Sequence, residues 1–102
     1  MTARRSTALK QAIWLVIAAI PHGRVCTYGD IANMAGQPGQ ARWVGRLLSE
    51  LPPDSTLPWH RVVNASGKIT HPNASKQVQR LQDEGIQTVH QRVALKRYRW
   101  QP

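Results

Sequence analysis

Apolar residues between positions 9 and 20 recur at the spacing of one helix face, and they are Leu9, Ile13, Val16, Ile17 and Ile20. Ser6 or Thr7 can cap this helix, and the segment from Pro21 to Gly23 ends it. The stretch is too short to span a bilayer, and it lacks the cleavage pattern of a signal peptide. We therefore expect a core helix in a cytoplasmic protein that has no membrane partner.

Two further helices are predicted on either side of a turn at residues 36–39, which contains two glycines and a proline. The first runs from residue 28 to about 35, with Thr27 as its N-cap and Asp30 in its first turn. The second, from about 40 to 51, places Arg42 and Arg46 on its polar side. Its inward face comprises Val44, Leu47, Leu48 and Leu51. This pattern indicates a helix-turn-helix over about residues 28–51, although many helical hairpins are only structural.

The rest of the chain predicts a small β element, one more helix and a tail. A loop over about residues 52–63 leads into a strand at 61–63, a turn at 64–67 and a strand at 68–69. A helix follows from about Ser75 to Glu84 and is closed by Gly85. In the basic tail, residues 96–102, we expect Tyr98 and Trp100 to pack and the charges to face solvent, with phosphate contact as the alternative. The fold class is mainly α in a single domain, residues 1–102.

The chain is strongly basic, since 14 Lys and Arg residues oppose five Asp and Glu residues and give a formal net charge of +9. A polyanionic partner such as nucleic acid follows naturally, although a basic surface also favours solubility. Cys26 is the only cysteine, which excludes an internal disulfide and a zinc site of several thiolates. It lies in an apolar run, so we expect a packed thiol without chemistry. We expect no metal and no cofactor.

The segment Pro58-Trp59-His60-Arg61-Val62 carries the most information about function. It resembles the Pro-Cys-His-Arg-Val segment of the O6-alkylguanine-DNA alkyltransferases, whose cysteine takes the alkyl group from guanine. An indole has no acidic, polarisable atom that attacks an alkyl carbon as a thiolate does. The resemblance therefore implies a protein that is not an enzyme and has no catalytic residue, as in the alkyltransferase-like proteins. From these five residues alone, an ordinary buried Trp beside two surface cations stays open.

Two other stretches resemble the same family. Residues 20–32 look like the entry to its helix-turn-helix, and Ala41-Arg42-Trp43-Val44-Gly45 looks like the start of its recognition helix. With residues 58–63, the three motifs follow the order of the family and span about residues 9–84. The resemblance implies a winged-helix-like DNA-binding domain of the alkyltransferases, without their N-terminal domain.

The resemblance also implies roles in nucleotide flipping, because an O6 substituent on guanine lies inside the base stack. Arg42 matches the finger that fills the vacated space, and Tyr28 matches the residue that pushes the 3′ phosphate of the target. Ala41, Gly45 and Arg46 are expected to contact DNA beside them. A phosphate-binding or solvated Arg42 and a Tyr28 that only packs remain the alternatives.

For the lesion pocket, the resemblance implies a lining of Trp59, Tyr28, Pro58 and Val62. His60 and Arg61 are expected to support the loop. A core position for Trp59 is the alternative.

The chain departs from the family in three places. The Asn-Pro that braces the active-site turn of the enzymes appears here only as Leu51-Pro52 or Pro52-Pro53. The enzymes pair their His with a glutamate on the following helix, but the comparable position here is near Val78, and Glu84 lies further on. We therefore expect His60 to lack an acid partner, so that Trp59→Cys would transfer little or no alkyl group. The Gly-rich loop over the alkyl group is replaced by residues 70–73, which contain no Gly.

Two functions of different classes follow. In the first, the protein is a monomer at the prokaryotic nucleoid that binds double-stranded DNA with O6-alkylguanine, flips the damaged nucleotide and flags it for nucleotide excision repair proteins. In the second, it is a small helix-turn-helix transcriptional regulator that reads the major groove and has Trp59 in its core. The order of the motifs favours the first.

Overall fold

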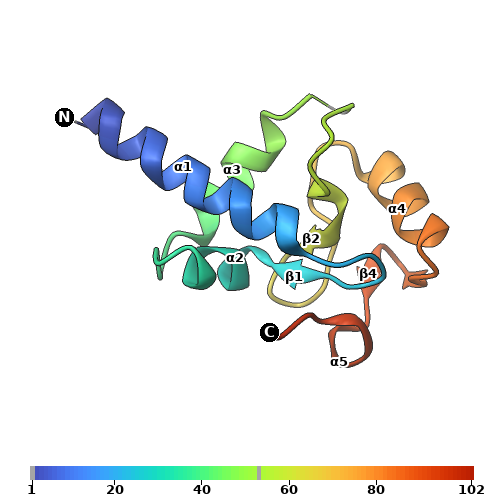
Figure 1. Cartoon of the computed structure of the whole chain (residues 1–102). Helices are drawn as coiled ribbons and strands as arrows, with labels where there is room; N and C mark the ends of the chain where they lie inside the picture. The colour runs from blue at the N-terminus through green and yellow to red at the C-terminus, as the bar shows by residue number, and fades with distance from the viewer. Residues whose placement is uncertain (1, 53) are drawn as a thin grey trace.

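The computed structural model describes residues 2–52 and 54–102, with side chains from residue 7 onward. Figure 1 shows helices α1, α2 and α3 at one end of the molecule, and helix α4, a β-hairpin and helix α5 at the other. The helices are α1 (Thr2–Ala19), α2 (Tyr28–Met34), α3 (Ala41–Ser49), α4 (Ala74–Asp83) and α5 (Leu95–Tyr98), with a 3₁₀ turn η1 (Trp59–Arg61). The strands are β1 (Cys26–Thr27), β2 (Val62–Val63), β3 (Thr88–Val89) and β4 (Arg92–Val93). No helix within the described ranges is long and apolar enough to cross a membrane.

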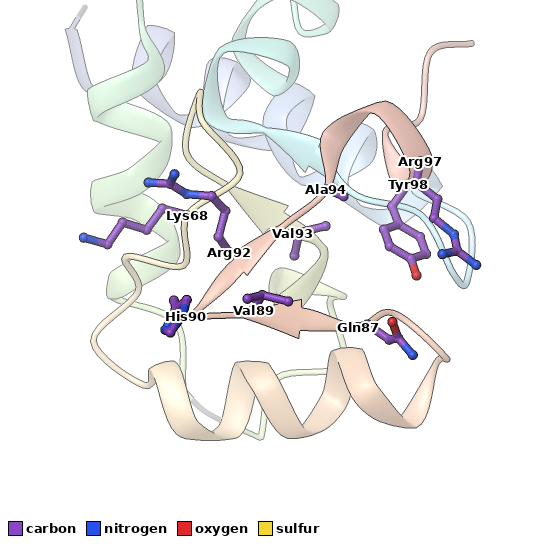
Figure 2. Close-up of a pocket in the computed structure, with 9 residues that line it drawn as sticks. All are labelled: Lys68, Gln87, Val89, His90, Arg92, Val93, Ala94, Arg97 and Tyr98. Carbon is purple, nitrogen blue, oxygen red and sulfur yellow. The ribbon is translucent and has the colours of Figure 1, made fainter.

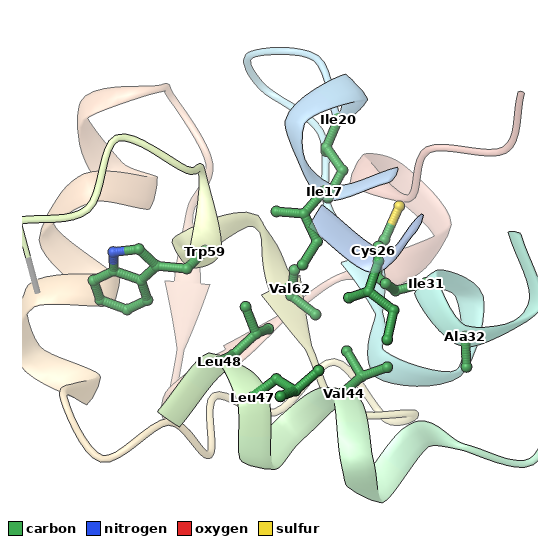
Figure 3. Packing of buried hydrophobic residues seen from close by; sticks show 11 residues of the cluster. Ile17, Ile20, Cys26, Ile31, Ala32, Val44, Leu47, Leu48, Trp59 and Val62 are labelled. Carbon is green, nitrogen blue, oxygen red and sulfur yellow. The ribbon is translucent and has the colours of Figure 1, made fainter. Parts of the chain in front are cut away.

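A parallel pair of short strands, β1 and β2, separates two apolar clusters. Cys26 pairs with Val62, and Thr27 pairs with Val63. Successive strand side chains point to opposite faces, so Val62 enters the cluster under α1, α2 and α3, whereas Val63 enters the cluster under α4 and the hairpin. Figure 3 shows the first cluster, in which Ile17 comes from α1, Ile31 from α2 and Val44 from α3. The β1–β2 pair thus fixes the position of the helix-turn-helix relative to the second half of the chain.

The two helices of the predicted helix-turn-helix are confirmed. Thr27 accepts from the Asp30 backbone N–H, and the Asp30 carboxylate accepts from the Thr27 N–H, which forms a capping box at the start of α2. Helix α3 buries Val44, Leu47 and Leu48 as expected and ends at Ser49, two residues earlier than predicted. The helix predicted from about Ser75 to Glu84 is confirmed as α4, which runs from Ala74 to Asp83.

The predicted cap of the first helix at Ser6 or Thr7 is wrong, because α1 is already helical at Thr2. Residues 2–8 include two alanines and two arginines and contain neither glycine nor proline, so nothing in them stops a helix. Ile13, Ile17 and Ile20 are buried, which confirms the apolar face.

The predicted strand at residues 61–63 is confirmed as β2, but the predicted strand at 68–69 is wrong, since Lys68 forms only an isolated bridge. The turn between them does form, since the Asn64 Oδ1 accepts from the backbone N–H of Ser66 and Lys68 at 3.0 and 2.8 Å. However, β2 pairs with β1, and Lys68 forms a bridge with Arg92. The β3–β4 hairpin was missed because its turn uses His90 and Gln91 with φ of 52° and 58°, where glycine or asparagine is the usual signal.

The tail packs against both apolar clusters. Trp100 packs against the first cluster and Tyr98 against the second, which confirms the packed reading. The backbone of Val25 donates to Tyr98 O at 2.9 Å and accepts from Trp100 N at 2.8 Å. The Arg99 charge is paired with Asp30 instead of facing solvent alone, with 3.0 Å between Nε and Oδ2.

Candidate nucleic-acid interface

An open cleft of about 640 Å³ lies between the helix-turn-helix and the loop that follows β2. Its lining contains two arginines and no acidic residue. The lining residues are Tyr28, Gly29, Ala41, Arg42, Gly45, Arg46, Ser49, Asn64, Ala65, Thr70, His71 and Pro72. All five residues expected to contact DNA, which are Tyr28, Ala41, Arg42, Gly45 and Arg46, thus lie on one surface.

Tyr28 bridges the two walls of the cleft. It is the first residue of α2, and its ring lies against α3, where a Cβ on Gly45 would be 3.8 Å from Tyr28 Cε1. Its hydroxyl lies 3.5 Å from Thr70 Oγ1 on the opposite wall. The side chain is half-buried, so one part of the ring packs while another faces the cleft.

Arg42 and Arg46 place two positive charges on the α3 wall. Both are exposed and stand one helical turn apart near the start and middle of α3. No acidic side chain among the described residues forms an ion pair with either of them. Unpaired guanidinium groups above an open cleft suit phosphate oxygens and other anions.

His71 forms the end wall of the cleft, and sequence reasoning did not single out its role. Its Nδ1 accepts from the Asn73 N–H at 3.0 Å, so its Nε2 carries the proton and donates to Leu48 O at 3.0 Å. The imidazole is 8% exposed, and both of its nitrogens are engaged. The wall is therefore held in one orientation by contacts on both sides.

Trp59 lies behind this wall and is not part of the open cleft. It is 1% exposed, and its ring stacks on His71 with 4.4 Å between centroids and an interplanar angle of 29°. The Arg80 guanidinium carbon lies 5.3 Å from the ring centroid, within the range of a cation–π contact. Figure 3 shows the indole at the far end of the first cluster, next to α4.

Of the four residues expected to line the lesion pocket, only Tyr28 lines the cleft. Val62 is 1% exposed in β2, Pro58 is half-buried, and neither contributes to the lining. The physical reason is η1, which turns the chain inward directly after Pro58 and carries Trp59 into the core. The Trp59 indole N–H is buried without a hydrogen-bond partner among the described residues.

The expectation that His60 lacks an acid partner is wrong. His60 Nε2 lies 2.6 Å from Glu84 Oε2, and Arg61 donates to the same carboxylate from Nε at 3.0 Å and from its terminal nitrogen at 2.8 Å. The Gly23 N–H donates to Oε1 at 2.8 Å. Glu84 reaches η1 because it caps the C-terminus of α4, just before a left-handed Gly85 with φ of 81°.

The pKa values of both Glu84 and His60 are lowered in this network. Burial raises the pKa of Glu84, but the hydrogen bonds from Arg61, from the Gly23 backbone and from His60 outweigh it and lower the pKa to about 2. Burial lowers the pKa of His60 despite the opposing effect of Glu84. Neutral His60 therefore donates its Nε2 proton to an ionised Glu84, and its Nδ1 is a buried acceptor without a partner among the described residues.

Gln77 holds the same loop from the other side and was also missed. It is fully buried on α4, and its Nε2 donates to His60 O at 3.0 Å and to Val62 O at 2.8 Å. These bonds satisfy the His60 carbonyl in η1 and the Val62 carbonyl directly after it. The support role expected for His60 and Arg61 is therefore shared with Glu84 and Gln77.

Cys26 is a packed thiol, as expected. It is fully buried in β1, and burial, reinforced by the charge of Asp30, raises its pKa to about 12. A thiol with this pKa is almost entirely neutral at pH 7 and is a poor nucleophile.

The chain matches the family model described as "6-O-methylguanine DNA methyltransferase, DNA binding domain" over residues 8–86. It is 48% identical to the "DNA base-flipping protein" of Escherichia coli K12 over 99 residues, covering 94% of this chain and 77% of that protein. A crystal structure of Schizosaccharomyces pombe Atl1 in complex with damaged DNA containing O6-carboxymethylguanine superimposes with a TM-score of 0.86 at 33% identity. This match covers 92% of this chain and 95% of the other.

The comparison with an alkyltransferase enzyme covers less. The "Methylated-DNA--protein-cysteine methyltransferase" of Mycobacterium tuberculosis H37Rv is 42% identical over 66 residues, which is 65% of this chain and 40% of the enzyme. The fold of the DNA-binding domain is therefore common to proteins named for base flipping and to a protein named for methyl transfer.

The Glu84 network makes a prediction about stability and pH. The folded-state pKa of Glu84 is lowered from 4.5 to about 2, so its stabilisation is present above pH 4.5 and is lost as the pH falls towards 2. Glu84→Gln should remove this part of the pH dependence and lower the free energy of unfolding at pH 7 by roughly 3 kcal/mol, since Arg61 would lose its partner. Urea unfolding at a series of pH values measures both effects.

The exposed neighbour Asp83 supplies the control, because Asp83→Asn removes one negative charge from the same helix end. This variant should follow the wild-type pH profile. Identical profiles for Glu84→Gln and wild type would show that the carboxylate does not support the fold in the way described.

Proposed function

Because the chain belongs to the family of the 6-O-methylguanine DNA methyltransferase DNA-binding domain, we propose that it binds double-stranded DNA at O6-alkylguanine without removing the alkyl group. The damaged nucleotide rotates out of the stack into the cleft between α2, α3 and the loop after β2. The observation that carries this proposal is the cleft itself, which brings Tyr28 and Arg42 together while no thiol stands at position 59.

Arg42 acts as the finger that fills the space left by the rotated nucleotide. It is exposed at the second position of α3, where the helix meets the solvent above the cleft. Its side chain is long enough to enter a base stack, and its planar guanidinium can stack on and hydrogen-bond to neighbouring bases. Ala41 has a small side chain and Gly45 has none, so the DNA backbone can approach α3 closely.

Tyr28 presses on the phosphate 3′ to the target and contacts the rotated nucleotide. Its position between Gly45 and Thr70 places the ring across the entrance of the cleft. Arg46, one turn beyond Arg42, binds backbone phosphate and adds affinity that does not depend on the lesion.

The rotated base meets His71 at the end of the cleft. Trp59 does not meet the base directly. It stacks on the far side of the His71 imidazole, and Pro58 and Val62 hold Trp59 in this position. A buried Trp59 also agrees with the regulator alternative. Family membership and the similarity to Atl1 bound to damaged DNA favour lesion binding.

The protein lacks a group that can accept an alkyl group. Position 59 holds an indole, and Cys26 is buried in β1 with a raised pKa. The His60–Glu84 pair survives as a structural brace. A stable complex with the lesion would then serve as a signal, and we propose that nucleotide excision repair proteins receive it.

The first prediction from this proposal is binding without chemistry. After incubation with a duplex that contains O6-methylguanine, the intact mass of the protein should be unchanged and the methyl group should remain on the DNA. Mass spectrometry of both components measures this directly. A protein adduct of one methyl group with guanine restored would refute the proposal.

The second prediction concerns Arg42. Arg42→Ala should weaken binding to lesion duplex by roughly 1–3 kcal/mol, the scale of the unstacking that the finger offsets. It should also reduce the fluorescence change of a base analogue placed opposite the lesion. Arg46→Ala is the comparison, because loss of a phosphate contact should weaken binding to damaged and undamaged duplex alike. If Arg42→Ala lowered the affinity for damaged and undamaged duplex equally, Arg42 would not be the finger.

A further inference from the structure

A second open hollow, of about 590 Å³, lies against the β3–β4 hairpin and α5. It shares no lining residue with the cleft. Figure 2 shows Lys68, His90 and Arg92 at one end and Arg97 at the other, with Val93 and Ala94 between them. The hollow is therefore an apolar surface with positively charged ends.

The positive charges of the hollow are not neutralised within the protein. Its lining contains no acidic residue. Within residues 2–52 and 54–102, the ion pairs involve Glu84 and Asp30, and none includes Lys68, Arg92 or Arg97. Arg97 lies over the Tyr98 ring at 5.3 Å, which holds its charge at the edge of the hollow. Both ends are thus available to anionic groups of a partner.

The centre of the hollow distinguishes between classes of partner. Val89 on β3 is 67% exposed and lines the hollow between its charged ends, so it offers an apolar contact there. A DNA backbone offers phosphates to the cations, but only the small C–H surface of its sugars to cover Val89. A peptide with acidic residues on both sides of an apolar side chain matches both features.

The hairpin that forms the hollow is held in a fixed shape. His90 and Gln91 both adopt left-handed backbone conformations, which are costly for residues other than glycine. The Gln91 carbonyl accepts from the Ile69 N–H at 2.8 Å, and the Val93 N–H donates to Gly67 O at 2.8 Å. A surface that is already ordered costs little further entropy when a partner binds.

We propose that this hollow binds an acidic segment of a partner protein, with an apolar side chain over Val89 and carboxylates beside Lys68, Arg92 and Arg97. Because the hollow is separate from the cleft, the segment binds while DNA occupies α3. The inference adds a partner surface to the proposed lesion-flagging role and rests on that role only for its biological purpose.

The test uses a fluorescein-labelled peptide in which one Leu is flanked on each side by several Glu residues, measured by fluorescence anisotropy with the full chain. One control peptide carries Ser in place of Leu, and another carries Gln in place of Glu. The protein variants are Val89→Thr, which keeps the branched shape, and Lys68→Glu combined with Arg92→Glu. Lys10→Glu on α1 is the charge control and is compared with Lys68→Glu alone, since each reverses one charge and Lys10 is exposed and lies outside the hollow.

The acidic Leu peptide should bind wild type more tightly than either control peptide, with and without a bound undamaged duplex. The double variant should weaken its binding about tenfold or more, and Lys10→Glu should change it by less than about twofold. Val89→Thr should remove the preference for the Leu peptide over the Ser peptide. This variant carries the test by itself if the double variant does not fold.

Three results would overturn the proposal. Lys10→Glu could weaken peptide binding as much as the double variant does, which would indicate that net charge alone drives the binding. The Leu and Ser peptides could bind wild type equally. The double variant could weaken duplex binding and leave the peptide unaffected, which would make the hollow a phosphate surface. Because the peptide is measured without a lesion, failure here is distinct from failure of lesion binding.

Discussion

The geometry of the candidate site depends on the hydrogen bonds that the Glu84 carboxylate accepts. This carboxylate accepts hydrogen bonds from Gly23, His60 and Arg61, and Arg61 also donates to Ile20 O at the end of α1, at 2.8 Å. One side chain therefore ties the end of α4 to η1 and to the connection between α1 and β1. A buried carboxylate with several donors is stable only when all of them are in place, so these segments are fixed together.

Fixing η1 determines the shape of the cleft. The turn directs Trp59 into the core, Trp59 stacks on His71, and His71 closes the cleft that Tyr28 and Arg42 line. In an enzyme with a thiol at position 59, a histidine and carboxylate pair at this place would serve proton transfer. Here the pair holds η1, and through Trp59 it supports His71 in the cleft. Position 59 carries a large packed ring with no reactive sulfur atom.

Local signals in the sequence were sufficient for the helix-turn-helix. Thr27 and Asp30 form a capping box within three residues, and the apolar spacing of α3 is independent of the rest of the chain. The positions of Trp59 and Glu84 depend on contacts that no local pattern encodes. Glu84 stands 24 residues after His60. The left-handed Gly85 that follows Glu84 predicts the end of the helix, but it does not predict where the Glu84 side chain points. His71 likewise takes its place from Leu48 and Trp59.

The hairpin behind the second hollow was missed for a related reason, because residues that tolerate a left-handed backbone poorly occupy its turn. Such a turn is maintained by the bonds to Gly67 and Ile69, which lie far from it in sequence. The net charge predicted a polyanionic partner but not where it binds. Of the 14 Lys and Arg residues, two line the cleft and three line the hollow, two surfaces with different lining chemistry.

Lesion recognition by the cleft is tested most directly by titrating the protein into two labelled duplexes that differ only in one O6-methylguanine, at the same salt concentration. We expect the damaged duplex to bind at least about tenfold more tightly, a difference of about 1.4 kcal/mol. Equal affinity for the two duplexes would contradict lesion recognition and would leave only general binding of a basic protein to DNA.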